Sequence, residues 1–286
     1  MDQQIDRQID HYAVLGNPVA HSRSPFIHAL FARQTGQAIG YGRVLCPLDG
    51  FAQTVRDFAA QGGRGCNVTV PFKFEAPDLA AHCTARARLA GAANVLRLDA
   101  GGWWADNSDG VGLVRDIEQG AGRVLHGQWV LLVGAGGAGA GVLGPLLSAR
   151  PAQVVVANRT APKAAELVQR HAAWALEHGV QLTAAGLDSA GLGFDVVINA
   201  SSASLQGAPS PVSEAAIQPG TLALDLMYGP AALPFLSWAQ RLGAVPRDGL
   251  GMLVEQAAEA FYFWRGVRPD TAPVLAALRA EMAAGR

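Results

Sequence analysis

The sequence predicts an α/β protein with two domains, the second of which contains a doubly wound parallel sheet. Three observations support this fold class. Predicted strands alternate with predicted helices along most of the chain, and the alternation starts again after residue 110. A glycine-rich loop then follows the first strand after that restart. The length of 286 residues is compatible with two domains of ordinary size.

The composition indicates a cytoplasmic protein that binds small molecules. Half of the residues are hydrophobic and the net charge is -1, so no excess of basic residues favours nucleic acid or an anionic membrane. No apolar run reaches the ~18 residues of a membrane span, and residues 1–11 lack the apolar core of a signal peptide. Cys46, Cys66 and Cys83 show no paired spacing, and we interpret them as reduced thiols.

The first half of the chain predicts a mostly parallel sheet with helices between its strands. Ser24 and Pro25 are typical of a helix start, with serine as the N-cap and proline in the first turn. That helix is expected to end at Gly36. The predicted strands are 12–16, 41–46 and 65–70, a second helix is predicted at 50–61, and a hairpin at 95–106 is expected to turn around residues 100–102.

The second half repeats the alternation and closes with helices. Residues 129–133 are a short apolar run that predicts a buried strand. Further strands are predicted at 154–158, 194–200, 221–227 and near 244–245, with helices at 160–179, 250–266 and 271–282.

The glycine loop after residue 133 indicates dinucleotide binding. Gly134, Gly136 and Gly139 fit the pattern G-x-G-x-x-G between a predicted strand and a predicted helix. Such glycines permit a tight turn and let the cofactor pyrophosphate approach the helix N-terminus. We therefore predict a Rossmann-type domain.

The end of the next strand favours NADP over NAD. NAD-binding domains usually carry an acidic residue there, which binds the ribose 2′-hydroxyl. This chain has Asn158, Arg159, Thr160 and Lys163 instead. Their cations and polar groups suit a 2′-phosphate.

Lys73 and Asp109 are the candidate catalytic residues. Lys73 follows a strand that Pro71 ends, and Asp109 lies where the two halves of the chain meet. A dehydrogenase needs a group that accepts or returns the alcohol proton, and a lysine in a dry cleft can do so. A neighbouring carboxylate would orient the lysine and share the proton. The alternative interpretation of Lys73 is a solvated loop charge.

Neutral polar residues near these positions suit a hydroxylated acid as substrate. Ser22 and Ser24 crowd a helix N-terminus, which favours a carboxylate. Asn67, Thr69 and Asn94 can bond to hydroxyl groups.

Taken together, the motifs resemble the shikimate dehydrogenase family through nearly the whole chain. The matching stretches are GNPVAHSRSP, NVTVPFK, LAGAAN, DNSDG, GAGGAG, NRT, INAS and DGLGMLVEQAA, in this order. The resemblance implies a substrate domain formed by residues 1–110 and 250–286, and an NADP domain formed by residues 111–249. It also implies reversible NADPH-dependent reduction of 3-dehydroshikimate to shikimate, a step of aromatic amino acid biosynthesis.

The resemblance assigns a role to each matching residue. Lys73 and Asp109 are implied as the catalytic pair. The implied substrate contacts are Ser22, Ser24, Asn67, Thr69, Asn94, Tyr228 and Gln256. The implied NADP contacts are Gly134, Ala135, Gly136, Gly137, Ala138, Gly139, Asn158, Arg159, Thr160, Lys163, Leu226 and Gly249.

The chain departs from the family pattern at three positions, of which Val95 bears on substrate identity. Val95 replaces a hydroxyl residue beside Asn94, Ala85 stands where some members have an acid, and Ser108 replaces the usual threonine. A related dehydrogenase acting on quinate or aminoshikimate, a folate dehydrogenase, and an NADP-binding regulator without catalysis are the alternatives. The scattered histidines predict no metal site, and the expected assembly is a monomer or homodimer.

Overall fold

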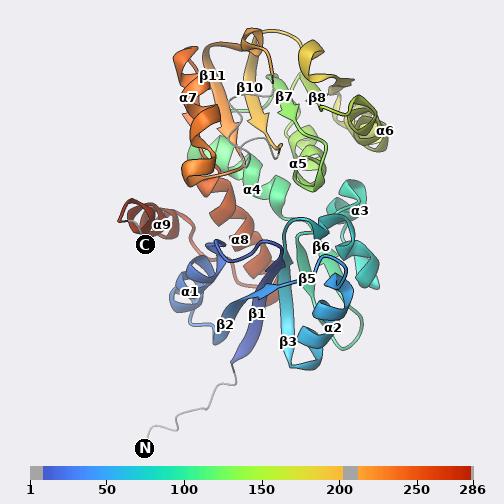
Figure 1. Ribbon diagram of the computed structural model, residues 1–286, viewed down its shortest axis with the longest axis vertical. Coiled ribbons are helices and arrows are strands. Elements are labelled where there is room, and N and C mark those ends of the chain that lie inside the picture. Colours follow the sequence, from blue (N-terminus) through green and yellow to red (C-terminus); the bar gives the residue numbers. More distant parts are fainter. Residues whose placement is uncertain (1–8, 202–211, 285–286) are drawn as a thin grey trace, which may run out of the picture. The chain divides into compact units, whose positions relative to one another are not determined.

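The computed structural model describes residues 9–201 and 212–284, which fold into two compact α/β units (Figure 1). Unit 1 comprises Met1–Arg88, Ala92–Ser108 and Ala257–Arg286, and unit 2 comprises Leu89–Gly91 and Asp109–Gln256. The predicted α/β class and the restart of the pattern are thus confirmed. The prediction about the extreme N-terminus falls mostly on residues 1–8, which lie outside the described residues.

Unit 1 contains a mixed six-stranded sheet in the order β2-β1-β3-β5-β6-β4. β1 pairs in parallel with β2 and β3, whereas β5 pairs antiparallel with β3 and β6 in the predicted hairpin. The strands are β1 (Asp10–Gly16), β2 (Ile39–Leu45), β3 (Gly63–Val68), β4 (His82–Cys83), β5 (Val95–Arg97) and β6 (Trp104–Asp106).

Alternation along β1 directs side chains to two different cores of unit 1. Ala13 and Leu15 pack with Phe51 and Val55 of the helix α2, because residues two apart on a strand share a face. The opposite face carries Tyr12, whose ring packs on Trp264. The helices of this unit are α1 (Ser24–Thr35), α2 (Phe51–Ala60), α3 (Ala85–Ala90), α8 (Leu250–Arg265) and α9 (Ala272–Ala283), of which α3 and α8 each run partly into unit 2.

Unit 2 contains a parallel six-stranded sheet in the order β12-β11-β10-β7-β8-β9 (Figure 1). From β7 the chain proceeds outward through β8 and β9, and it then returns to the other side of β7 with β10. Ligands bind at the carboxyl ends of strands beside such a reversal of order. The strands are β7 (Trp129–Val133), β8 (Gln153–Ala157), β9 (Gln181–Ala185), β10 (Phe194–Asn199), β11 (Ile217–Asp225) and β12 (Val245–Arg247).

Helices cover both faces of the unit 2 sheet. Val130 and Leu132 pack with Leu143 and Leu146 of α5, whereas Leu131 and Val133 pack in a second core that includes Phe235 of α7. This burial on both faces explains the continuous apolar run of β7. The helices are α4 (Asp109–Arg115), which continues as a π-helical turn (Asp116–Gly120), α5 (Gly137–Ser148), α6 (Ala161–His178) and α7 (Leu233–Arg241).

Two details of the sequence prediction differ from the structure. Ser24 is the first residue of α1 and Arg23 is the N-cap, so the prediction of a serine cap was wrong. Gly36 does end α1, in the left-handed conformation that glycine favours. The strand predicted at 65–70 is also shifted, because β3 spans Gly63–Val68 and ends before Thr69.

Unit 2 extends further along α8 than the predicted NADP domain. Its last residue is Gln256, whereas the predicted boundary was residue 249. The close approach of Gly112 explains the extension, because a Cβ on this glycine would lie 2.6 Å from the Gln256 backbone nitrogen. Within the described residues, none of the helices is long and apolar enough to cross a membrane.

Candidate functional site

Two of the predicted substrate residues lie at the end of β3 in unit 1. Asn67 is 8% exposed in this strand, and Thr69 follows the strand directly. Gly16, the last residue of the adjacent β1, makes room for Thr69, because an added Cβ there would lie 2.3 Å from its Cγ2 atom. The glycine in the motif GNPVAHSRSP is therefore required by packing.

Asn67 is bonded to residues on either side of it. Its Nδ2 donates to the carbonyl oxygen of Asn94 at 3.2 Å, and its Oδ1 accepts from the Tyr41 hydroxyl at 2.6 Å. The Asn94 carbonyl also accepts from the backbone N–H of Val68 at 2.8 Å. The structure thus brings Asn67 and Asn94 together, as their shared predicted role requires.

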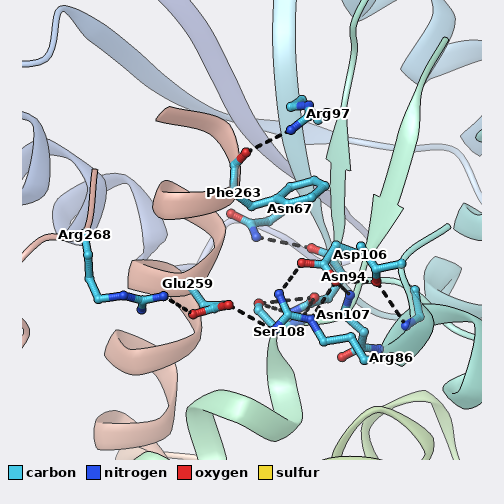
Figure 2. A network of polar contacts seen from close by, with 12 residues as sticks. Asn67, Arg86, Asn94, Arg97, Asp106, Asn107, Ser108, Glu259, Phe263 and Arg268 are labelled. Atoms are coloured by element: carbon cyan, nitrogen blue, oxygen red, sulfur yellow. Dashed lines mark hydrogen bonds and ion pairs between the residues drawn. The ribbon is translucent and has the colours of Figure 1, made fainter. Parts of the chain in front are cut away.

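Asn94 is fixed by the segment that leads to Asp109 (Figure 2). Its Oδ1 accepts from the backbone N–H of Ser108 at 2.8 Å, and its Nδ2 donates to the Ser108 hydroxyl at 3.0 Å. Its own backbone N–H donates to the Asp106 carbonyl at 3.1 Å. Asn94 is 2% exposed, so these bonds define the position of its amide.

A buried ionic network supports the same segment (Figure 2). The Asp106 carboxylate is fully buried and accepts from Arg86, whose NH1 also donates to Glu259 at 2.9 Å. Arg268 binds the other oxygen of Glu259 at 2.6 Å. Burial lowers the pKa of Arg86, but the bonds and charges of Asp106 and Glu259 outweigh burial and raise it overall. Arg86 therefore remains a cation.

Ser22 and Ser24 lie together at the beginning of α1. The Ser22 hydroxyl donates to Oγ of Ser24 at 3.2 Å, and it accepts from the Ser24 backbone N–H at 3.3 Å. Arg43 of β2 donates to the Ser22 carbonyl through two nitrogens, at 2.6 Å and 3.0 Å. These bonds place two hydroxyls and a guanidinium next to one helix start.

Lys73 lies in a short helical turn, Phe72–Phe74, after β3. Lys73 is half-buried, and its backbone carbonyl oxygen accepts a hydrogen bond from the backbone N–H of Ala93 at 2.8 Å. All 22 basic residues of the sequence are arginines except Lys73 and Lys163. Both lysines were singled out on other grounds as functional residues.

His28 of α1 lies beside the polar cluster, where its imidazole approaches the side chain of Asn67. It is fully buried, and among the described residues neither Nδ1 nor Nε2 finds a hydrogen-bond partner. Burial lowers the pKa of His28 to about 3, so its imidazole is neutral at physiological pH. Its ring stacks on that of Tyr41, with centroids 4.2 Å apart and an interplanar angle of 5°.

The glycine loop of unit 2 has the geometry expected for pyrophosphate binding. Gly134 has φ of 113°, and a Cβ on Gly139 would lie 2.1 Å from the Gly134 carbonyl oxygen. A Cβ on Gly136 would meet nothing within 4 Å, so this glycine leaves open space before α5. The residues present therefore fit a dinucleotide, with Gly137 and Ala138 in the first turn of α5 and Ala135 beside it.

The predicted 2′-phosphate residues follow β8. The side chain of Asn158 accepts from the Ala135 backbone N–H at 3.2 Å and donates to the Thr160 carbonyl at 2.9 Å. Arg159, Thr160 and Lys163 are exposed. Asn158 thus connects the glycine loop to an accessible pair of cations.

The remaining predicted residues of unit 2 follow strand ends or begin helices. Asp109 is the first residue of α4 and is 1% exposed. A Cβ on Gly249 would lie 2.3 Å from the Leu226 carbonyl oxygen, so these two residues lie together. Tyr228 follows β11 by a few residues, and Gln256 lies in α8.

The structure therefore brings together Asn67 with Asn94, Ser22 with Ser24, the glycine loop with Asn158, and Leu226 with Gly249. Lys73 belongs to unit 1 and Asp109 to unit 2, and their pairing stays a prediction. The sequence analysis missed Tyr41, Arg86 and Asp106 as supporting residues. Only the position of Asp106 in the motif DNSDG could have indicated one of them, because the other two contacts join distant parts of the chain.

The glycine loop on an all-parallel sheet and the polar strand ends of unit 1 define a dinucleotide-dependent enzyme with a two-unit α/β fold. Comparison with family models is more specific. Residues 14–96 match the shikimate dehydrogenase substrate binding domain, residues 116–217 match shikimate / quinate 5-dehydrogenase, and residues 249–279 match the shikimate 5'-dehydrogenase C-terminal domain.

Individual relatives give the same result. A shikimate dehydrogenase (NADP(+)) of Methylibium petroleiphilum is 64% identical over 277 residues, which cover 95% of this chain and 94% of the relative. The crystal structure of an Ael1 enzyme from Pseudomonas putida is 45% identical, with a TM-score of 0.86 over 94% of this chain and 98% of that one. The chain belongs to the shikimate dehydrogenase family.

A third comparison concerns the ligands of a relative. The shikimate 5-dehydrogenase of Thermus thermophilus, solved in complex with NADP(H) and shikimate, is 32% identical to this chain. Its TM-score is 0.80, over 95% of this chain and 99% of that one.

Proposed function

We propose that this protein catalyses the reversible NADPH-dependent reduction of 3-dehydroshikimate to shikimate, in the route to the aromatic amino acids. The observation that carries the proposal is Lys73, which lies in the turn after β3 and whose backbone carbonyl accepts from Ala93, the residue before Asn94. Apart from Lys73 and Lys163, every Lys or Arg position of the chain is an arginine. Since arginine does not release its proton in proteins, a lysine at position 73 suits proton transfer.

In this proposal Lys73 and Asp109 handle the proton of the substrate hydroxyl. Lys73 gives a proton to the carbonyl oxygen during reduction and takes it back during oxidation. The Asp109 carboxylate orients the ammonium group through charge-assisted hydrogen bonding. NADP, when bound, supplies or accepts the hydride.

The neutral and hydroxyl side chains would orient the ring of the substrate. Ser22 and Ser24 would bind the carboxylate, because their two hydroxyls lie together at a helix start and can donate to it. Asn67, Thr69 and Asn94 would bind ring hydroxyls, with Tyr228 and Gln256 as further substrate contacts. Val95 stands where the family pattern has a hydroxyl residue. Its side chain is fully buried in β5, so it packs as an apolar group.

The cofactor would bind to unit 2. The loop from Gly134 to Gly139 would hold the pyrophosphate, and Asn158, Arg159, Thr160 and Lys163 would surround the 2′-phosphate. Leu226 and Gly249 would line the nicotinamide end through their backbones. On this basis the substrate domain would be residues 1–110 and 250–286 and the NADP domain residues 111–249, with a boundary that lies at the start of α8, earlier than the end of the compact unit 2.

The decisive experiment follows NADPH absorbance with purified protein, NADP, and either shikimate or quinate. We expect turnover of shikimate, and a fall in kcat of about 100-fold or more in Lys73→Arg, which keeps the charge but not the proton transfer. The control is Lys163→Arg, the same change at the other lysine, which keeps a cation for the 2′-phosphate and should keep kcat at saturating NADP. A wild-type kcat in Lys73→Arg would refute the role of Lys73.

The same assay separates the alternative functions. Preference for quinate would keep the mechanism and change the substrate, and turnover of an aminated analogue would do the same. NADPH binding without turnover of shikimate, quinate or the aminated analogue would favour the alternative of an NADP-binding regulator without catalysis. A folate substrate is disfavoured by the paired serines, and an assay with folate derivatives tests it directly.

We also propose that the protein acts in the cytoplasm as a monomer or homodimer. The two buried thiols Cys46 and Cys66, together with Cys83, are free, as suits a reducing compartment. Sedimentation analysis would decide the assembly, and fractionation of cells would decide the location.

A further inference from the structure

We propose that Tyr41 is a positioning residue for substrate binding, and that it acts by fixing the side-chain amide of Asn67. The inference rests on the proposed function, in which Asn67 contacts the substrate. Tyr41 itself belongs to none of the motifs that define the family resemblance, and it lies 26 residues before Asn67 in the sequence.

The sheet of unit 1 brings the two side chains to one face. Strand β1 lies between β2 and β3. Tyr41 of β2 pairs with Tyr12 of β1, and Asn67 of β3 pairs with Val14 of β1. Tyr12 and Val14 are two residues apart and therefore share a face of the sheet. Tyr41 and Asn67 thus point to the same side, where their bond of 2.6 Å spans β1.

The bonds at Asn67 permit only one orientation of its amide. The Asn94 carbonyl oxygen can only accept, so it must face Nδ2 of Asn67. Oδ1 then faces Tyr41, whose hydroxyl must be the donor. The bond to Asn94 uses one of the two N–H groups on Nδ2, and the second N–H can donate to a substrate oxygen.

The Tyr41 ring is itself fixed by aromatic packing. The buried imidazole of His28 stacks on one face at a centroid distance of 4.2 Å, and Trp264 of α8 lies 6.3 Å away. Burial raises the pKa of the Tyr41 hydroxyl well above 10.0, so the hydroxyl keeps the proton that it donates. Loss of this donor would leave Oδ1 of Asn67 with less to define its position.

A purely structural role for Tyr41 is the rival explanation, and Tyr12 provides the matched control. The Tyr12 ring also packs on Trp264, at a centroid distance of 4.7 Å. Its hydroxyl, however, accepts from NH1 of Arg265 at 3.3 Å and contacts none of the proposed substrate residues. Removing either hydroxyl therefore perturbs the same aromatic group, but only one removal affects Asn67.

The experiment compares Tyr41→Phe, Tyr12→Phe, Asn67→Ala and the double variant Tyr41→Phe with Asn67→Ala in the full chain. KM and kcat are measured for shikimate, and the shikimate Kd is measured by calorimetry for variants with low turnover. We expect Tyr41→Phe to raise KM about five- to tenfold with kcat changed less than about twofold. The KM for NADP should not change, and Tyr12→Phe should resemble the wild type.

The double variant distinguishes positioning from general loss of packing. The Tyr41 hydroxyl also contacts Ser24, so if Tyr41 acts mainly through Asn67, the effect of Tyr41→Phe on shikimate affinity should be several-fold smaller once Asn67 is alanine. Equal KM values for the two phenylalanine variants, or a full effect of Tyr41→Phe in the Asn67→Ala background, would overturn the inference. If the wild-type protein turns over shikimate, the proposed function holds whatever the variants show. If the wild-type protein does not turn over shikimate, the proposed function itself is refuted.

Discussion

Arg86 and Asp106 form a double hydrogen bond in which the carboxylate is fully buried. Nε of Arg86 donates to Oδ1 at 2.7 Å, and NH2 donates to Oδ2. The same Oδ1 accepts from the backbone N–H of Asn107 at 2.8 Å. The ion pair therefore fixes the backbone that leads to Ser108 and Asp109.

Replacing Arg86 with methionine should destabilise the protein strongly, because it leaves the buried Asp106 carboxylate without its cation. Removal of one partner of a buried pair costs about 3 to 5 kcal/mol in the free energy of unfolding. Chemical denaturation would measure this loss. Arg268→Met is the control, because Arg268 belongs to the same network with 40% of its side chain exposed. Equal losses in the two variants would contradict the argument.

The free energy of unfolding should fall as the pH is lowered from 7 to 5. The folded pKa of His28 is about 3, whereas an unfolded histidine titrates near 6.5, so protons bind the unfolded chain first. The expected loss from this residue is about 2 kcal/mol. Burial also lowers the pKa of His171, which adds in the same direction.

Denaturation of His28→Phe over the same pH range isolates the contribution of His28. The variant keeps an aromatic ring against Tyr41 but cannot take up a proton. Its free energy of unfolding should therefore vary less with pH than that of the wild type. Parallel pH curves for the two proteins would exclude His28 as the titrating group.

Two glycines of the same loop should respond differently to alanine. Gly136→Ala should keep the melting temperature, since its Cβ would meet nothing within 4 Å, but should raise the KM for NADP by filling the space for pyrophosphate. Gly139→Ala should destabilise the fold, because its Cβ would lie 2.1 Å from the Gly134 carbonyl oxygen. Thermal melts and steady-state kinetics of both variants test the pair. An unchanged KM in Gly136→Ala would argue against pyrophosphate at this position.

Removal of Arg159 should weaken NADP binding selectively. Loss of one charge-assisted bond to the 2′-phosphate predicts a rise in KM for NADP of about tenfold or more in Arg159→Ala, with the KM for NAD nearly unchanged. Arg56→Ala, which removes an exposed arginine of unit 1, is the control. A similar rise for both cofactors would mean that Arg159 does not bind the phosphate.

The sequence predicted those parts of the fold that depend on local patterns. The strand Trp129–Val133 matches the predicted range, and the turn conformation of Gly36 follows from the residue type. Helix α7 and strand β9 were not predicted, although Pro234 lies in the first turn of α7, where proline is favoured. β9 has only five residues, and two of them are alanines, which strands disfavour. Their form depends on packing against neighbours.

The site was predictable to a similar degree. Residues within family motifs, such as Asn67 and Asn94, do lie together in the structure. The bonds of Tyr41 to Asn67 and of Arg86 to Glu259 join positions 26 and 173 residues apart. No local pattern specifies such contacts, because they arise only when the sheet and α8 are assembled.

The discontinuous chain of unit 1 has a consequence for biosynthesis. The rings of Phe261 and Trp264 that pack on His28 belong to α8, which the ribosome makes after β1, α1 and the whole sheet of unit 2. The nascent N-terminal half therefore emerges with its aromatic face uncovered, whereas unit 2 is complete once Gln256 has left the ribosome. Vectorial synthesis thus favours unit 2 as the first to fold, and the face of β1 and α1 stays open to chaperones until α8 has been made.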